Sequence, residues 1–214
     1  MTSDLTPNIS ELPQLPSKHR WHAQVRPVPS IIAILRTTKR EAAYPPDAYL
    51  LIQRIKPPYM HKWGMVGGKW DFGESLEEAV AREVMEETGL CTSFHSLRGI
   101  MNERILPLDQ NTPGGHYVLF VCELRVAGGT AQEKYEGPVR WFGYNELQSK
   151  AAEGEIIATD FALIQAFRHP PPHLIFIEAE VLSEKNKGKR IDRITRFDIF
   201  QEQNPDCEND YSRV

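Results

Sequence analysis

The sequence has little of what membrane-spanning or disulfide-stabilised proteins need. Among its 214 residues no apolar run approaches membrane-spanning length, and no secretory hydrophobic segment lies near the N-terminus. Only three cysteines occur, Cys91, Cys122 and Cys207, and none has a CxxC or metal-ligand spacing. An odd number of cysteines without such spacing indicates reduced thiols. We therefore expect a cytoplasmic protein with no membrane partner.

An excess of positive charge is also missing. The chain has 25 Lys and Arg against 29 Asp and Glu, which gives a formal net charge of −4 at pH 7. This balance argues against a general nucleic-acid-binding surface, so we expect no nucleic-acid partner. An anionic small-molecule substrate would need metal ions and a few local cations to be bound at all.

What the sequence does have is one stretch dense in carboxylates, GKWDFGESLEEAVAREVMEETGL, which covers residues 68–90. Ser75 followed by Glu78 has the spacing of a capping box, and this predicts a helix that begins near Leu76. Gly89 is the residue type expected just past the helix end. Lys and Arg are absent from the last turn, where they would interact favourably with the helix dipole. Something other than helix stability therefore accounts for the acids.

The positions of three of these acids point to a metal site. At roughly 100° per residue, Glu83, Glu86 and Glu87 fall within about a third of the helix circumference. They share this arc with the apolar residues of the first turns, so the stripe that should face the protein continues into a carboxylate cluster. Hard oxygen ligands of this kind suit Mg²⁺ or Mn²⁺. The alternative is a solvated outer face stabilised by pairs four residues apart.

The same stretch resembles the Nudix box. Nine residues stand at its defining positions and spacing: Gly68, Glu74, Arg82, Glu83, Val84, Glu86, Glu87, Gly89 and Leu90. The preceding run PPY-x-x-KW-x-x-x-GG-K is also similar to the approach to the box in many Nudix hydrolases, although Val66 stands where many members have proline. The resemblance implies an α/β fold, an α/β/α sandwich with a mixed sheet, and metal-dependent hydrolysis of a phosphoric anhydride bond in a small nucleotide.

The resemblance also implies roles for individual residues. Four positions match the metal ligands of the family, for Mg²⁺ or Mn²⁺: Gly68 through its carbonyl, Glu83, Glu86 and Glu87. Arg82 is expected to orient glutamates rather than to touch substrate, and Glu74 to brace the loop against the helix. The general base in the family is either a box glutamate or an acid from a later loop. Glu136 matches such a loop acid, with Glu133 as the near alternative.

Three cations are candidate phosphate contacts: Arg54 on the strand before the box, Lys69 and Arg104. Each could equally be an ordinary surface cation. Trp63 and Trp70 could contact a base, but packing is the favoured interpretation. His116, alone at a strand entrance, is more often a structural histidine than a catalytic one.

The chain divides into four parts by composition: a flexible segment 1–22, a Nudix domain 23–170, a β-hairpin extension 171–202 and a disordered tail 203–214. Apolar and β-branched runs predict strands at 28–35, 48–55, 116–126 and within 93–104, and an amphipathic helix at 159–167. Residues 61–74 are interpreted as a glycine-rich loop that leads into the helix. The hairpin strands are expected at 173–182 and 190–200, joined by the polar turn SEKNKGK.

The substrate is less well defined than the chemistry. The PPY-to-GGK run resembles the ADP-ribose pyrophosphatase branch, and Pro107, 17 residues past Leu90, is an approximate match to a proline associated with that specificity. The rival within the enzyme class is a nucleoside triphosphate pyrophosphohydrolase, including the type that clears oxidised dGTP. A non-catalytic nucleotide sensor is the alternative outside it, although sensors typically have an eroded box. The added hairpin and the resemblance favour a homodimer.

Overall fold

The computed structural model describes residues 27–37, 47–56, 59–106, 114–169, 171, 173–186 and 189–200. The strands are β1 (Val28–Leu35), β2 (Ala48–Gln53), β3 (Trp63–Lys69), β4 (Cys91–Leu106), β5 (Gly115–Gly128), β6 (Val139–Gly143), β7 (Ile175–Asn186) and β8 (Lys189–Phe200). The helices are α1 (Leu76–Thr88), α2 (Tyr144–Ala152) and α3 (Ala158–Arg168). Within these residues the strands form one sheet in the order β6-β2-β3-β1-β5-β4-β7-β8.

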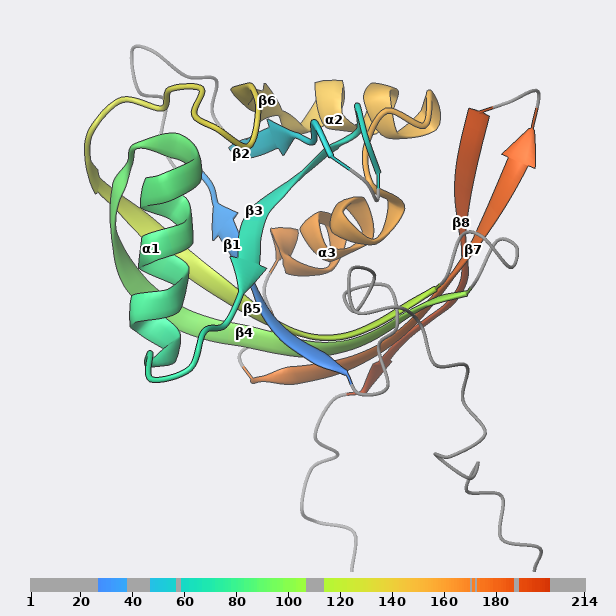
Figure 1. Ribbon diagram of the computed structural model, residues 1–214, viewed down its shortest axis with the longest axis horizontal. Helices are drawn as coiled ribbons and strands as arrows, with labels where there is room; N and C mark the ends of the chain where they lie inside the picture. Colours follow the sequence, from blue (N-terminus) through green and yellow to red (C-terminus); the bar gives the residue numbers. More distant parts are fainter. Residues whose placement is uncertain are drawn as a thin grey trace, which may run out of the picture.

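The sheet is mixed, and helices cover both of its faces. Strand β1 is parallel to β5 and β4 is parallel to β7, whereas the other neighbouring strands are antiparallel. Helix α1 packs its buried Ala79, Val80 and Val84 into a core on one face. Helices α2 and α3 contribute buried leucines and isoleucines to a second core on the other face. Figure 1 shows α1 and α3 on opposite sides of β3, so the predicted α/β/α sandwich is confirmed.

The interpretation of residues 61–74 as a loop is wrong for its first half, because residues 63–69 form β3 between β1 and β2. Glycines disfavour a strand in general, since they have no side chain to pack. Here Gly67 is needed for a close approach, because a Cβ on it would lie 2.3 Å from the Ile31 carbonyl oxygen. The pairing of Gly67 with Ile32 in β1 therefore sets the path of the chain just before the acidic helix.

The predicted C-terminal hairpin is present, and its strands are longer than expected. β7 and β8 pair from Phe176 with Phe200 to Asn186 with Lys189, with one register shift between Glu180 and Val181, so most of the predicted polar turn is strand. The pairing of β7 with β4 ends at Leu182 with Leu106, and the distal part of the hairpin extends beyond it (Figure 1). The hairpin thus adds two strands to one edge of the sheet.

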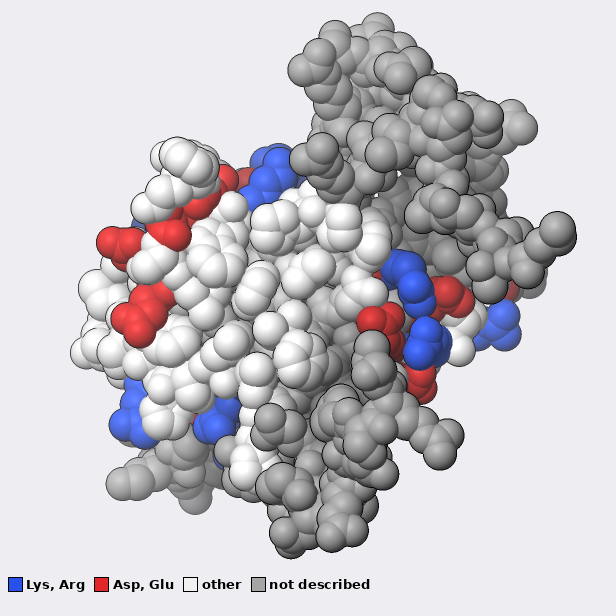
Figure 2. Space-filling model, turned by 90° about the horizontal axis from the view of Figure 1, so that it is seen from below, with Lys and Arg blue, Asp and Glu red and all other residues white. Residues whose placement is uncertain are grey.

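Several predictions from the sequence lie outside the described residues. These are the flexible segment 1–22, Pro107, Cys207 and the tail 203–214. Among the helices that the structure describes, none combines the length and apolarity required to cross a membrane. On the face seen in Figure 2, the described Lys and Arg are scattered among Asp and Glu around a largely uncharged centre.

Candidate active site

The acidic helix begins and ends where its local signals predict. Ser75 accepts a hydrogen bond from the Glu78 backbone N–H, and the Glu78 side chain accepts one from the Ser75 backbone N–H, which completes the capping box. Gly89 ends the helix in the left-handed conformation, at φ 74°. The last turn has no basic residue. The helix therefore presents its carboxylates at a C-terminal end that no cation of its own last turn neutralises.

The three box glutamates differ sharply in exposure. Glu87 is buried at 7% exposure, the Glu83 side chain is 15% exposed, and the Glu86 side chain is 60% exposed. Glu87 Oε2 accepts a hydrogen bond of 3.2 Å from the Gly67 N–H, which ties the helix to β3. The acids therefore lie along a gradient from the core to the surface, beside the end of β3.

Burial makes two of these carboxylates unusually basic. Desolvation raises the pKa of Glu87 to about 8, opposed by the Gly67 N–H and raised further by Glu83 and Glu136. Desolvation also raises the pKa of Glu83, while the hydrogen bond from Arg82 lowers it. Two neighbouring carboxyls that resist ionisation favour a bound cation, because a cation would restore the charged form of both.

Arg82 holds several of the acids in place. Its Nε donates to Glu74 Oε1 at 2.6 Å and its Nη2 to Glu74 Oε2 at 3.0 Å. Its Nη1 donates to Glu83 Oε1 at 2.9 Å and to Glu86 Oε2 at 3.3 Å. Glu74 also accepts from the Asp71 N–H, so it joins the loop to the helix through Arg82. The guanidinium thus donates to carboxylates and to the Lys69 carbonyl of the chain itself, and its orienting role stays a prediction.

Gly68 approaches Glu83 more closely than any residue with a side chain could. A Cβ on Gly68 would lie 2.4 Å from the Glu83 carboxyl carbon and from its Oε1. Gly68, Glu83 and Glu87 line the same cavity, and oxygen donors of this kind are what a hard divalent cation requires. The side chains do not yet converge, since no group of three His, Cys, Asp or Glu in the described residues is arranged to hold a metal ion. Arg82 draws Glu83 and Glu86 to itself, and Gly67 holds Glu87.

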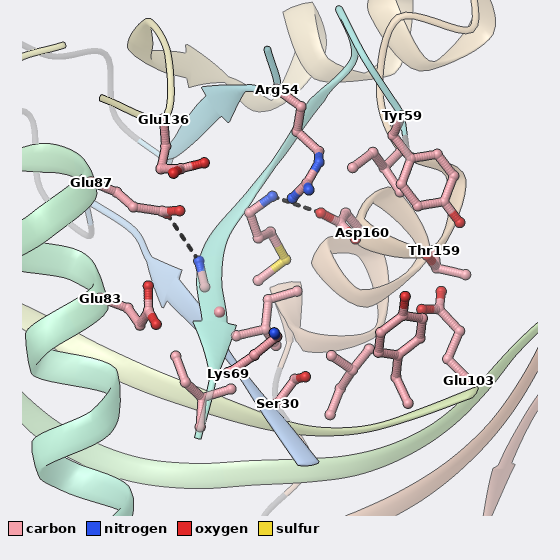
Figure 3. A pocket seen from close by; sticks show the side chains of 18 of the residues that line it. Ser30, Arg54, Tyr59, Lys69, Glu83, Glu87, Glu103, Glu136, Thr159 and Asp160 are labelled. Carbon is pink, nitrogen blue, oxygen red and sulfur yellow. Dashed lines mark hydrogen bonds between the residues drawn. The ribbon is translucent and has the colours of Figure 1, made fainter. Parts of the chain in front are cut away.

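A cavity of ≈ 660 Å³ runs from these acids across the end of β3. Its volume falls in the range of small-molecule sites. At one end it is lined by Gly67, Gly68 and the box glutamates, and at the other by Tyr59, Glu103, Thr159 and Asp160. Figure 3 shows Glu83 and Glu87 projecting from α1 on one side and Tyr59, Thr159, Asp160 and Glu103 on the other, with Arg54 between them.

Three of the other predicted site residues line this cavity. Arg54 lies near both Glu87 and Asp160, and its charge lowers the pKa of each. Lys69 is exposed at the rim. Glu136 lies beside Glu87 in Figure 3 and forms an ion pair of 2.9 Å with Lys56. Glu133, the alternative to Glu136, is exposed and is not among the residues that line the cavity.

Arg104 is the exception, and its prediction as a phosphate contact needs correction. The guanidinium lies 3.6 Å from Glu178 and 4.0 Å from Glu180 of β7, and Arg104 does not line the cavity. The reason is the alternation of side chains along a strand. Its neighbours Glu103 and Ile105 both face the cavity, so Arg104 faces the opposite side of the sheet.

Two buried acids of the cavity were missed by the sequence interpretation. Glu103 sits at an inward position of β4, between the buried Met101 and Ile105. This alternation was a signal, because a charged residue in an apolar row is unusual unless it is functional. Asp160 lies in the first turn of α3, where an acid is expected for helix stability and thus attracts no attention. Its Oδ2 accepts a hydrogen bond of 2.7 Å from the Met65 N–H of β3.

The aromatic residues and the histidine have structural partners. Trp63 packs edge-on against Phe142, and Trp70 packs edge-on against Phe120 while its Nε1 donates to the Glu74 carbonyl. The Nε2 of His116 lies 2.6 Å from the Asn102 side-chain oxygen. These contacts favour packing and structural roles.

Residues 26–161 match the family model of the NUDIX domain. The chain belongs to the NUDIX family. The match covers the strands and helices that build the acidic site, and it ends within α3, before the C-terminal hairpin.

Curated NUDIX relatives share part of their length with this chain. The ADP-ribose pyrophosphatase of Methanocaldococcus jannaschii is 34% identical over 113 residues, which is 52% of this chain and 64% of the relative. The uncharacterized Nudix hydrolase YvcI of Bacillus subtilis is 30% identical over 118 residues, or 55% of this chain and 72% of the relative. The chain therefore spans slightly less than two thirds of the archaeal protein.

Solved NUDIX structures show the same fold. The MutT protein of Bacillus halodurans superposes with a TM-score of 0.54 at 20% identity, covering 80% of this chain and 97% of the other. A NUDIX hydrolase of Nitrosomonas europaea superposes with a TM-score of 0.53 at 24% identity, covering 67% and 90%.

Proposed function

We propose that this protein is a metal-dependent pyrophosphohydrolase that cleaves a phosphoric anhydride bond in a nucleoside diphosphate-linked substrate, ADP-ribose or a related nucleotide sugar. The observation that supports this most directly is the pair of buried, basic carboxylates of Glu83 and Glu87, which lie beside Gly68 at one end of a cavity. The identity to the archaeal ADP-ribose pyrophosphatase supports the choice of substrate.

The proposed metal ligands are Glu83, Glu87 and the Gly68 carbonyl, with Glu86 joining them when its side chain turns from Arg82. A bound Mg²⁺ or Mn²⁺ would supply Lewis-acid polarisation of the phosphates. The donor set fits such an ion, since it consists of oxygens only and carries more negative charge than Arg82 alone offsets. Arg82 acts on the proposed metal ligands rather than on the metal, because it limits the directions in which the Glu83 and Glu86 side chains can turn.

The other residues of this half of the cavity act on substrate and water. Arg54 and Lys69 carry the positive charge that diphosphate oxygens require at the opening. Glu136 is the proposed general base, because it lines the cavity from a loop beside Glu87 and its side chain is 46% exposed. Its ion pair with Lys56 must open before its carboxylate can accept a proton from water. A box glutamate remains the alternative base.

The test is hydrolysis of a nucleotide panel with Mg²⁺, resolved by product chromatography, for the wild type and three variants. Glu86→Gln and Glu87→Gln should lower kcat by roughly two orders of magnitude or more each. Glu77→Gln is the matched control, because Glu77 is an exposed acid in the first turn of the same helix and should leave kcat unchanged. The panel contains ADP-ribose, a sugar nucleotide, dGTP and 8-oxo-dGTP.

Each result of the panel has a definite meaning. Preference for ADP-ribose supports the proposed substrate, and preference for a triphosphate replaces it with triphosphate pyrophosphohydrolysis. Tight binding of an intact nucleotide without turnover under any metal would overturn the enzymatic proposal and favour a nucleotide sensor.

We also propose that the hairpin 171–202 is an extension of the catalytic domain 23–170 through which the chain forms a homodimer. β8 is one of the two edge strands of the described sheet, and Ile191, Ile199 and Phe200 on it are 42–50% exposed. Exposed apolar side chains on an edge strand favour pairing with another chain. Light scattering should give the mass of a dimer, and Ile199→Lys should shift it to a monomer.

We propose a cytoplasmic location because the cysteines of the described residues are free thiols. Cys91 is exposed and Cys122 is buried, and both are free thiols, as is usual in a reducing compartment. Fractionation of cells that express the tagged protein would test this.

A further inference from the structure

The end of the cavity remote from the acidic helix contains a carboxyl group that the proposed chemistry does not use. Glu103 lines the cavity from β4, next to Thr159 and Asp160 at the start of α3 (Figure 3). The residue is 6% exposed, and desolvation raises the pKa of its carboxyl. A hydrogen bond from the Thr159 side chain opposes that rise.

One oxygen of this carboxyl is unused. Glu103 Oε1 is buried and has no hydrogen-bond partner within the part of the chain that the structure describes. Asp160, equally deep in the same cavity, is different, because its Oδ2 accepts from the Met65 N–H and so holds β3 against α3. A buried acceptor left without a donor is unfavourable for folding. Glu103 therefore has a feature that its role in the fold does not explain and that a ligand donor would satisfy.

The walls around Glu103 favour a flat apolar group. Tyr59, Ile105, Ile157 and Val181 form a small buried cluster, and Tyr117 packs against it. All of these except Val181 also line the cavity. Apolar and aromatic walls with a few fixed polar groups are typical of sites for heterocyclic ligands, and aromatic side chains stack on nucleobases. Carboxylate side chains accept hydrogen bonds from nucleobase N–H groups.

The two ends of the cavity can thus be assigned together. If the diphosphate lies at Glu83 and Glu87, as the proposed function requires, the part of the substrate farthest from the reacting phosphates extends past Arg54 towards Tyr59 and Glu103 (Figure 3). We propose that Glu103 determines nucleobase specificity, and that its Oε1 accepts a hydrogen bond from an N–H of a purine base. This inference rests on the proposed function for the orientation of the substrate.

The test measures binding rather than hydrolysis. Three nucleotides are titrated by calorimetry in the presence of Mg²⁺: AMP, GMP and purine riboside 5′-monophosphate, whose base carries no N–H. None of the three has an anhydride bond, so turnover does not interfere. The proteins are the wild type, Glu103→Leu, Glu103→Gln and the control Glu184→Leu, an exposed β7 residue.

The wild type should bind AMP or GMP at least about tenfold more tightly than purine riboside 5′-monophosphate, as one hydrogen bond to a carboxyl allows. Glu103→Leu should lose that preference and bind all three alike. Glu103→Gln keeps an acceptor oxygen and should retain part of the preference, and Glu184→Leu should retain all of it. A thermal melt of Glu103→Leu should show only a small change of Tm, because the variant removes an unpaired buried oxygen as well as the hydrogen bond from Thr159.

Two results would overturn the inference: an unchanged preference in Glu103→Leu, or equal weakening of all three nucleotides. A fall in Tm of Glu103→Leu together with equal weakening would assign Glu103 to the fold instead. The binding pattern is independent of catalysis. Hydrolysis of ADP-ribose without this binding preference would contradict only the role of Glu103. The binding preference without hydrolysis of any nucleotide would contradict only the proposed reaction.

Discussion

The Glu83 carboxyl group fills the space that a side chain on Gly68 would need at the end of β3. A Cβ on Gly68 would lie 2.4 Å from the Glu83 carboxyl carbon. The atoms that it would meet are the far end of a flexible side chain rather than backbone. Gly68→Ala should therefore displace the Glu83 carboxylate while it leaves the fold intact. We expect kcat with Mg²⁺ to fall by roughly tenfold or more, with a loss of stability below about 1 kcal/mol.

Kinetics and urea denaturation of the same preparation would check this prediction. Gly128→Ala is the matched control, since a Cβ there meets nothing within 4 Å, and it should change neither quantity. Full activity of Gly68→Ala would show that the position of Glu83 does not matter for the reaction.

Gly67→Ala, unlike Gly68→Ala, should lower the stability of the fold. A Cβ at Gly67 would lie 2.3 Å from the Ile31 carbonyl oxygen and 2.9 Å from the Ile32 Cα, and these backbone atoms cannot turn away. β1 and β3 would have to separate, so we expect a loss of unfolding free energy of roughly 1–3 kcal/mol, as for overpacked cores. Urea denaturation measures it. Equal stability of the Gly67→Ala and Gly68→Ala proteins would contradict the distinction between the two glycines.

Arg82 supplies a third prediction. Lysine keeps the charge but cannot contact Glu74 with two nitrogens while it reaches Glu83 and Glu86, as Arg82 does. Arg82→Lys should lower kcat or Mg²⁺ affinity by about 10–100-fold, as for residues that orient metal ligands. Steady-state kinetics over a Mg²⁺ titration would distinguish an effect on kcat from an effect on Mg²⁺ affinity. Arg193→Lys changes an exposed arginine paired with Glu184 and should have no effect; a similarly inert Arg82→Lys would argue against an orienting role.

The parts of the site that sequence reasoning found are those encoded locally. Ser75 and Glu78 are three residues apart and make their capping bonds with each other, and Gly89 sits where the helix must end. Spacing alone determines that Glu83 and Glu87 point the same way. No contact with a distant segment is needed for any of these features, so they can be predicted from the sequence.

The features that were missed depend on contacts between distant segments. Residues 63–69 contain three glycines and were interpreted as a loop, yet they form a strand because β1 and β2 flank them on both sides. Arg104 and Glu103 are adjacent, and only the side of β4 that the cavity occupies decides which of them can meet a substrate. Alternation shows that the two face opposite ways, but not which face is functional.

Asp160 gives the last prediction, which concerns pH. Burial raises its pKa to about 7 from the ordinary 3.8; the nearby Glu103 adds to the rise, while the Met65 N–H and Arg54 oppose it. Between about pH 4 and pH 7 the unfolded chain has released this proton, whereas the folded protein keeps it. Rising pH therefore favours unfolding across that window, and the loss is complete once the folded carboxyl ionises.

Asp160→Asn removes the titration but keeps an oxygen for the Met65 N–H. The unfolding free energy of the variant relative to the wild type should therefore increase from pH 4.5 to pH 7.5, by on the order of 1–4 kcal/mol at about 1.4 kcal/mol per pH unit. Urea denaturation at several pH values in this range gives the difference, and any constant cost of the buried amide cancels from its slope. A flat or falling difference for Asp160→Asn would mean that Asp160 is already ionised in the folded protein near pH 4, so that Arg54 and the Met65 N–H outweigh its burial.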